Sequence, residues 1–219
     1  MNKNADINKI FDVPCPLCGH SESMLTEKRE DGKWYMCMNQ SNNCGLFFVH
    51  DLTVINDVLE MMLKSATCTK KAIGAVVEKG GVLSGGFNGP PRGFEKYCQP
   101  CPRLNSPSGT DMDKCPAVHA EMSAILKSHK DVRGGILYIT CGLPCKDCMK
   151  EIIESGIVKI VSPYPLNTQD TEDRGNGYKS GESYNFNLSY EMMKAAGIEY
   201  KHENRLVKGD TAHVYIKGE

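Results

Sequence analysis

The chain is predicted to be an α/β protein of three layers, in which helices cover both faces of a mixed central sheet. Two observations predict this fold. Helix-like apolar patterns alternate with short strand-like runs along residues 51–219, as sheets with helical crossovers require. A glycine-centred hairpin adds an antiparallel pair to this alternation. Residues 1–50 carry a separate group of four cysteines, and we expect them to form a small domain of their own.

The predicted elements follow one another as helix, hairpin, helix, strand, helix, strand, helix and strand. Thr53 is expected to cap the first helix, and Gly156 and Gly197 are expected to end the third and fourth helices. Met122, Ile125 and Leu126 give the second helix an apolar spacing of i, i+3 and i+4. The predicted helices are 54–66, 119–127, 144–155 and 188–196, and the predicted strands are 72–78, 82–87, 135–141, 157–161 and 198–202.

The composition is that of an ordinary globular protein. Of the 219 residues, 40% are hydrophobic and 24% are charged, and no run is apolar enough to cross a bilayer. The amino terminus has no apolar signal core, which predicts a cytoplasmic location. Because disulfides are rare in that compartment, the 11 cysteines are better explained as metal ligands.

One pair of motifs carries the chemistry. His119-x-Glu121 is followed by Pro144-Cys145-x-x-Cys148, and both motifs fall at predicted helix starts. One imidazole and two thiolates can hold a zinc ion with a fourth position open to water, whose pKa then falls to about 7. Glu121 lies too close to His119 to share one tetrahedron with it, so we interpret it as the proton shuttle. Together the motifs resemble the signature of zinc-dependent nucleobase deaminases, which predicts hydrolytic deamination.

Either motif alone would be weak. A lone His-x-Glu is common by chance, and a lone Cys-x-x-Cys is as typical of a structural zinc half-site or a redox pair. The helix, strand, helix and strand that carry the two motifs in order favour the joint interpretation.

The first 50 residues predict a zinc ribbon. Its four ligands would be Cys15, Cys18, Cys37 and Cys44, with a strand-like segment at residues 33–36. So short a domain buries too little apolar surface to fold without a stabilising metal ion, which argues against unpaired thiols. Residues 1–53 hold five Lys and Arg against seven Asp and Glu, so the region lacks the basic face of a nucleic-acid reader.

A second structural zinc is predicted in the long, proline-rich and glycine-rich segment 88–115. Four thiolates could tie this segment to the end of the first helix, and the alternative is that they are buried apolar thiols. The cysteines are Cys68, Cys98, Cys101 and Cys115. The sequence therefore predicts about three zinc ions per chain, one catalytic and two structural.

Residues 54–165 resemble the deoxycytidylate (dCMP) deaminase family, most closely its phage and bacterial late-competence branch. The segments that carry the resemblance are 65–68 (SATC), 73–76 (IGAV), 86–93 (GFNGPPRG), 115–121 (CPAVHAE) and 144–148 (PCKDC). The resemblance implies a cytidine-deaminase-like fold and conversion of dCMP to dUMP with release of ammonia, which supplies deoxyuridylate for thymidylate synthesis. It implies that Asn88 contacts the sugar and base, that the backbone at Ala120 reads the cytosine edge, and that Tyr164 closes on the ring. It also implies dCTP and dTTP as effectors and a homo-oligomer, commonly a hexamer.

Two features depart from the family pattern. The ribbon is not part of it, and the polar segment 165–187 is longer than expected, so it could be a lid or a subunit contact. A monophosphate needs donors, for which Arg92 and Arg103 are predicted phosphate or effector ligands, with solvated charges as the alternative.

Two other functions compete with the nucleotide deaminase. A deaminase of transfer RNA or single-stranded DNA, with the ribbon holding nucleic acid, would use the same zinc chemistry. It fits poorly with a net charge of −1. A binding module that uses the deaminase fold only as a scaffold would have no need of the complete zinc and proton-shuttle motifs.

Overall fold

The structure is a computed structural model that describes residues 52–107, 109–166 and 184–209 with their side chains, together with the backbone of four earlier strands. Its contacts divide the chain into two compact units, each of which is taken on its own. The first comprises residues 1–55 and 79–82, and the second comprises residues 56–78 and 83–219. The predicted boundary at residue 50 stays a prediction.

The first unit contains an antiparallel sheet in the order β1-β2-β3-β4. Its strands are β1 Ile10–Asp12, β2 Glu22–Arg29, β3 Gly32–Cys37 and β4 Phe47–Val49. β3 includes the strand predicted at residues 33–36. The side chains of the four predicted ribbon ligands lie outside the described residues, so the ribbon zinc stays a prediction.

The second unit is built on a five-stranded sheet in the order β6-β5-β7-β8-β9. β7 pairs antiparallel with β5 and parallel with β8, and β8 pairs parallel with β9, so the sheet is mixed as predicted. The strands are β5 Gly74–Lys79, β6 Val82–Phe87, β7 Ile136–Ile139, β8 Lys159–Ser162 and β9 Glu199–His202.

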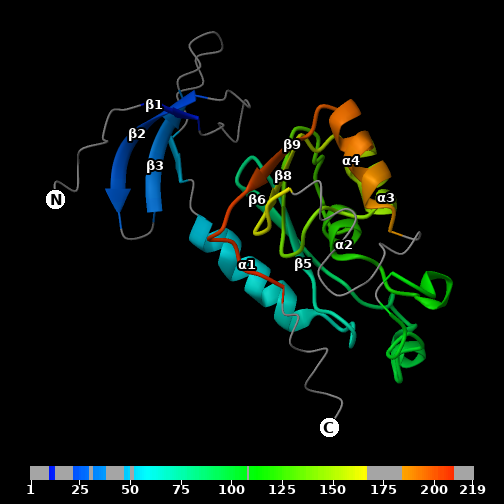
Figure 1. Cartoon of the computed structure of the whole chain (residues 1–219). Helices are drawn as coiled ribbons and strands as arrows, with labels where there is room; N and C mark the ends of the chain where they lie inside the picture. The colour runs from blue at the N-terminus through cyan, green and yellow to red at the C-terminus, as the bar shows by residue number, and fades with distance from the viewer. Residues whose placement is uncertain are drawn as a thin grey trace. The chain divides into compact units, whose positions relative to one another are not determined.

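Helices cover both faces of this sheet (Figure 1). Adjacent strand residues point to opposite faces, and two glycines of β6 show what each face meets. A Cβ on Gly85 would lie 2.7 Å from Met62 Sδ of α1, whereas a Cβ on Gly86 would lie 2.7 Å from Ala124 Cα of α2. α3 packs on α2 and α4, so the predicted three layers are confirmed. The helices are α1 Leu52–Ser65, α2 Ala120–Leu126, α3 Lys146–Glu154 and α4 Phe186–Ala195.

The core lies between the sheet and these helices. All four residues of β7 are buried, because helices cover the strand on both sides. Leu137 and Ile139 of this strand are fully buried together with Met149 and Ile152 of α3. This packing fixes α3, whose N-cap residue and first turn carry two of the predicted zinc ligands.

Two details differ from the sequence predictions. α1 already begins at Leu52, so Thr53 lies within its first turn rather than capping it. Leu126 is 71% exposed, because α2 turns Ala120 and Ala124 toward the sheet instead. Small side chains let the helix approach Gly86 closely, so Leu126 was a misleading guide to the buried face, whereas Ile125 packs against the core as predicted.

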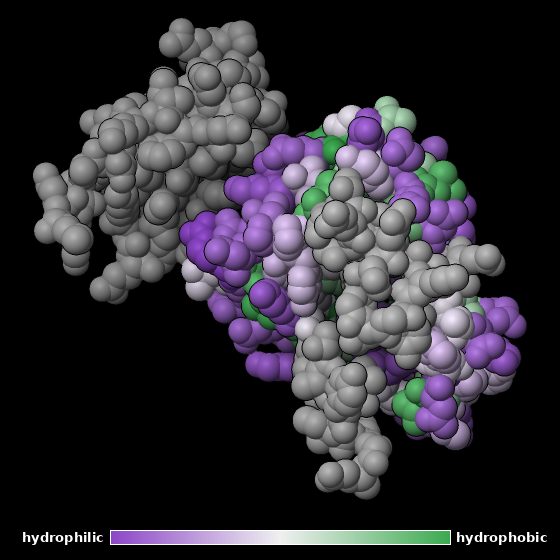
Figure 2. Space-filling view, viewed as in Figure 1, coloured by the Kyte–Doolittle hydropathy of each residue, from purple (hydrophilic) through white to green (hydrophobic). Residues whose placement is uncertain are grey.

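Segment 88–115 is irregular, as predicted. Among its described residues it contains only two short 3-10 helices, Glu95–Cys98 and Met112–Lys114, joined by turns. The described surface on the face shown in Figure 2 is mainly hydrophilic, with small separate hydrophobic areas. Within the described ranges, no helix is long and apolar enough to cross a membrane.

Candidate active site

Three predicted ligands meet in the second unit. His119 Nδ1 lies 3.2 Å from Cys148 Sγ and 3.5 Å from Cys145 Sγ. The three donor atoms all lie within 4.8 Å of one another, and no other group of three or more such side chains in the described residues comes close enough to share an ion. The sequence prediction for these three residues is therefore matched by their placement.

The geometry of this cluster fits zinc. Zn–N bonds of about 2.0 Å and Zn–S bonds of about 2.3 Å at tetrahedral angles put nitrogen and sulfur about 3.5 Å apart. The two nitrogen–sulfur distances in the cluster are close to that value. One imidazole and two thiolates also form a donor set that binds zinc in preference to harder cations.

Two helix N-termini hold the ligands. His119 is the N-cap residue of α2 and Cys145 is the N-cap residue of α3, which places Cys148 in the first turn of α3. The positive end of a helix dipole favours a thiolate there. The close approach of α2 to β6 depends on Gly86, since any side chain at that position would collide with the helix backbone.

Glu121 lies beside this cluster and is buried, with 5% of its surface exposed. Its Oε1 is 4.0 Å from Cys141 Sγ. Burial raises the pKa of the Glu121 carboxyl above its ordinary value, although the neighbouring His119 opposes that change. A carboxyl group whose pKa lies nearer neutrality is suited both to accept and to return a proton.

The ligand cluster also shifts its own protonation. Hydrogen bonding from Cys148 and from His119 lowers the pKa of Cys145 to about 4, and hydrogen bonding with Cys145 raises the pKa of His119 to about 9. The Cys145 thiolate raises the pKa of Cys148. An ion that binds here must displace the remaining protons, so its affinity falls at low pH.

The cluster opens into a cavity of about 980 Å³, measured out to its open mouth. Glu121 and His119 line its wall, so a ligand in the cavity would meet both the metal site and the buried carboxyl.

Comparison with known proteins identifies the family. The profile described as "cytidine and deoxycytidylate deaminase zinc-binding region" matches residues 49–163. The chain belongs to this deaminase family. A deoxycytidylate deaminase of Mycobacterium phage D29 is 39% identical over 105 residues, which are 44% of this chain and 80% of the phage protein.

Three further similar proteins are more distant or are matched over only part of their length. A deoxycytidylate deaminase of Schizosaccharomyces pombe is 36% identical over 112 residues, which are 48% of this chain. The match spans 34% of that protein, and a match to the Saccharomyces cerevisiae deoxycytidylate deaminase spans 38%. The crystal structure of the dCMP deaminase from cyanophage S-TIM5 in apo form is similar with a TM-score of 0.47 at 22% identity. That similarity covers 69% of this chain and 95% of the cyanophage chain.

The residues that the deaminase resemblance assigns to the substrate have different surroundings. Ala120 lies in the cavity wall at the start of α2. Asn88 also lines the cavity, but its Oδ1 accepts a hydrogen bond from Ile73 N at 2.9 Å and its Nδ2 donates one to Lys71 O at 2.7 Å. One amide N–H of Asn88 is left for a ligand, and the side chain also ties two backbone segments together.

Tyr164 is not among the residues that line the cavity. Its backbone oxygen accepts a hydrogen bond from Tyr200 Oη at 3.0 Å, at the end of the sheet. The aromatic side chains in the cavity wall are Tyr184 and Phe186, and Tyr184 O accepts a hydrogen bond from Lys146 N at 3.0 Å. The sequence reasoning missed this pair, for which the only signal was two aromatic residues just ahead of the helix predicted at 188–196.

The two predicted phosphate or effector ligands differ in exposure and in position relative to the cavity. Arg92 is exposed and does not line the cavity. Arg103 is only 5% exposed and does line it. Only Arg103 is placed to meet a ligand in this cavity.

The four cysteines of the predicted loop site line a second, smaller cavity together. Cys98 is buried and the other three are partly buried, and none forms a disulfide. They do not form a group close enough to share an ion in the arrangement described. The loop thus gathers the predicted residues without bringing them to coordination distance.

Proposed function

We propose that this chain catalyses the hydrolytic deamination of dCMP, in which dCMP and water give dUMP and ammonia. The observation that carries the proposal is the buried carboxyl of Glu121 beside the cluster of His119, Cys145 and Cys148. Relatives named deoxycytidylate deaminase support the choice of substrate.

The proposed mechanism divides the chemistry between zinc and the Glu121 side chain. Zinc held by the three ligands would supply a nucleophile near neutral pH, because it lowers the pKa of water to about 7. Glu121 would take a proton from the attacking water and pass it to the ring nitrogen N3. It would then carry a second proton to the departing amine, which leaves as ammonia. The burial that raises its pKa favours this repeated exchange.

The position of the base would be set by the cavity wall. The backbone at Ala120 would meet the edge of the cytosine, and Tyr184 with Phe186 would offer apolar surface to the nucleotide. Asn88 would contribute its remaining amide N–H to the sugar or base. The predicted contact between Tyr164 and the ring stays a prediction.

A substrate panel tests the proposal. The purified protein with zinc is given dCMP, dCTP, deoxycytidine, single-stranded DNA and transfer RNA under one condition, and ammonia release is measured. We expect the highest kcat/KM with dCMP. A higher value with either polynucleotide would favour the alternative nucleic-acid deaminase, and no release from any substrate would contradict deamination.

We also propose two structural zinc ions, one held by the four loop cysteines and one by Cys15, Cys18, Cys37 and Cys44. The shared cavity of the loop cysteines supports the first, and the second rests on cysteine spacing alone. Metal analysis should give about three zinc ions per chain, following the four-coordinate rule for structural sites.

Regulation by dCTP and dTTP and assembly into a homo-oligomer extend the proposal by resemblance. Light scattering during size-exclusion chromatography would give the oligomeric state. Initial rates with dCMP, measured with and without each triphosphate, would give the response. A cytoplasmic location and a role in supplying deoxyuridylate for thymidylate synthesis stay predictions.

A further inference from the structure

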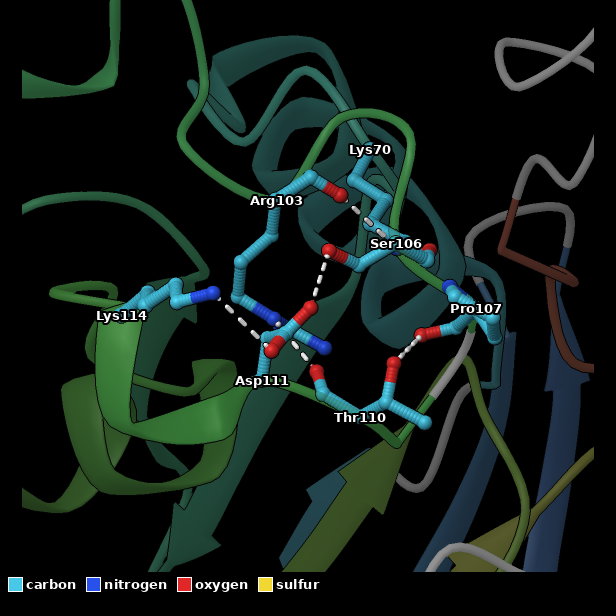
Figure 3. Close-up of polar contacts among 7 residues, drawn as sticks. All are labelled: Lys70, Arg103, Ser106, Pro107, Thr110, Asp111 and Lys114. Carbon is cyan, nitrogen blue, oxygen red and sulfur yellow. Dashed lines mark hydrogen bonds and ion pairs between the residues drawn. The ribbon is translucent and has the colours of Figure 1, made fainter.

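Arg103 is an unusual residue in segment 88–115, because its side chain is buried and firmly held (Figure 3). Its Nε donates a hydrogen bond to Thr110 O at 2.9 Å. Its backbone oxygen accepts one from Lys70 Nζ at 2.9 Å, and the same ammonium also donates a hydrogen bond to Ser106 O. The turn that carries Thr110 is fixed in turn by Asp111 Oδ2, which accepts a hydrogen bond from Ser106 Oγ at 2.7 Å. The guanidinium is therefore aimed by a local network rather than free to move.

One end of this guanidinium is unsatisfied. Arg103 Nη2 is buried and has no hydrogen-bond partner among the described residues. Cys115 and Tyr184 are near enough to interact with the group, but they leave that nitrogen unpaired. Arginine keeps its charge in proteins, so it does not escape this situation by losing a proton. A buried N–H donor without a partner is destabilising, and a bound anion would satisfy it.

The surroundings point to an anion that enters with the substrate. Arg103 lines the same cavity as His119 and Glu121. The described wall of this cavity also contains Lys70 and Lys71, against Glu121 as its one carboxylate. Lys70 is already engaged by two backbone carbonyls of the loop, so its ammonium fixes the loop and adds positive charge. A fixed arginine fork matches a phosphate with two parallel hydrogen bonds.

We propose that Arg103 is the residue that selects a phosphorylated substrate, by pairing its guanidinium with the phosphate of the bound nucleoside monophosphate. The inference rests on the proposed deaminase function and assigns a specificity-determining role within it. The metal cluster and Glu121 act on the base, and Arg103 holds the opposite end of the nucleotide. A nucleoside without phosphate leaves Nη2 unpaired and therefore binds more weakly.

The test compares two substrates that differ only in the phosphate. Initial rates with dCMP and with deoxycytidine are measured for the wild type, Arg103→Met, Arg103→Lys and Arg92→Met. Arg92 is exposed and lies outside the cavity wall, so Arg92→Met is the matched control for loss of one loop charge.

A hydrogen-bonded pair with a charged group contributes enough for us to expect about a 10- to 100-fold preference of the wild type for dCMP in kcat/KM. Arg103→Met should lose most of this factor through a higher KM for dCMP, with its rate on deoxycytidine little changed. Arg103→Lys should fall between the two, because a lysine keeps the charge but not the fork. Arg92→Met should behave as the wild type.

Several results would overturn the inference. The wild type could deaminate both substrates equally well, or Arg103→Met could lose the same factor on both, which is the mark of a structural role. Should Arg103→Met fail to fold, the wild-type ratio and the Arg103→Lys variant still decide. If the wild type deaminates neither substrate, the proposed function fails, and binding tests the inference separately. In that case, thermal stabilisation of the wild type by dCMP but not by deoxycytidine, with a smaller stabilisation of Arg103→Lys by dCMP, supports phosphate pairing. Equal stabilisation of the wild type by both compounds contradicts it.

Discussion

The two cysteine-bearing sites of the second unit differ in how completely the chain organises them. His119, Cys145 and Cys148 lie at the N-termini of two packed helices, and their donor atoms come within 4.8 Å of one another. Of the four cysteines of the loop site, Cys68 comes from the segment just after α1 and the other three come from the irregular segment 88–115. They share a cavity without reaching coordination distance.

The difference shows what regular structure contributes to a metal site. A helix fixes the separation of side chains three positions apart, so the packing that places α3 also places Cys145 and Cys148. A loop has no such repeat, and its cysteines depend on the ion itself to be drawn together. We therefore expect removal of the catalytic ion to change chemistry, and removal of the loop ion to change stability.

The largest expected effect is loss of a helix-borne ligand. Cys145→Ser should lower turnover of dCMP below about a thousandth of the wild-type value, because water without the metal keeps a pKa near 15.7. The zinc content should fall by about one ion per chain, and the melting temperature should fall as well, because an ion that binds only the native chain stabilises it. Ammonia release and metal analysis on the same sample check this, and an active zinc-depleted variant would contradict the site.

Loss of a loop ligand should lower stability and leave turnover intact. Cys101→Ser should also remove about one zinc per chain, and free zinc at a hundred times its Kd stabilises the native chain by about 3 kcal/mol. The variant should therefore melt several degrees lower and retain turnover below its melting point. Calorimetry with metal analysis measures both. An unchanged zinc content in Cys101→Ser would mean that these cysteines are ordinary buried thiols.

A glycine pair tests whether the helix position sets the catalytic ligands. Gly86→Ala should lower stability by about 1–3 kcal/mol, because the added Cβ overpacks against the backbone of α2 at Ala120 and Ala124. Displacement of α2 should also weaken zinc binding at His119. The adjacent Gly85→Ala is the matched control, since its Cβ meets only the flexible Met62 side chain and should lower stability by about 1 kcal/mol or less. Equal losses of zinc in both variants would show that the ligand geometry does not depend on the position of α2.

The smallest expected effect concerns Glu203, which lies outside both metal sites, just after β9. It measures an acid sensitivity of stability that does not involve zinc. Hydrogen bonding from Arg205 lowers the pKa of Glu203 to about 2. A lowered folded-state pKa contributes stability above the ordinary value of about 4.5, and this is lost as the pH falls toward 2.

Glu203→Gln should therefore be less stable than the wild type by about 1 kcal/mol or less above pH 5, since Arg205 is 71% exposed. The difference should shrink as the pH falls below 4.5. Urea unfolding of both proteins across this range measures it, and a constant difference would show that the carboxylate charge is not the cause.

Regular elements were predictable because their signals are local. The order of helices and strands, and the place of His119, Cys145 and Cys148 at helix starts, follow from apolar spacing and from the prolines and glycines at element ends. Gly156, with φ of +74°, ends α3 at the predicted position.

The cavity wall was less predictable, because it is assembled from distant and irregular segments. Burial of Arg103 depends on the turn at Thr110 and on Lys70, and no periodicity in the sequence reports these contacts. Tyr184 is held at the wall by a backbone hydrogen bond from Lys146, some forty residues away in sequence. The exposure of Leu126 likewise depends on which face of α2 meets a glycine strand.

The most direct test of the central claim is the turnover of Glu121→Gln measured together with its zinc content. Glutamine keeps the size of the side chain but carries no titratable proton, so the variant should retain its catalytic zinc. Its kcat for dCMP should fall by about 10²- to 10⁴-fold, the usual contribution of general acid–base catalysis. Full activity in the zinc-loaded variant would contradict the assignment of Glu121 as the group that moves the proton.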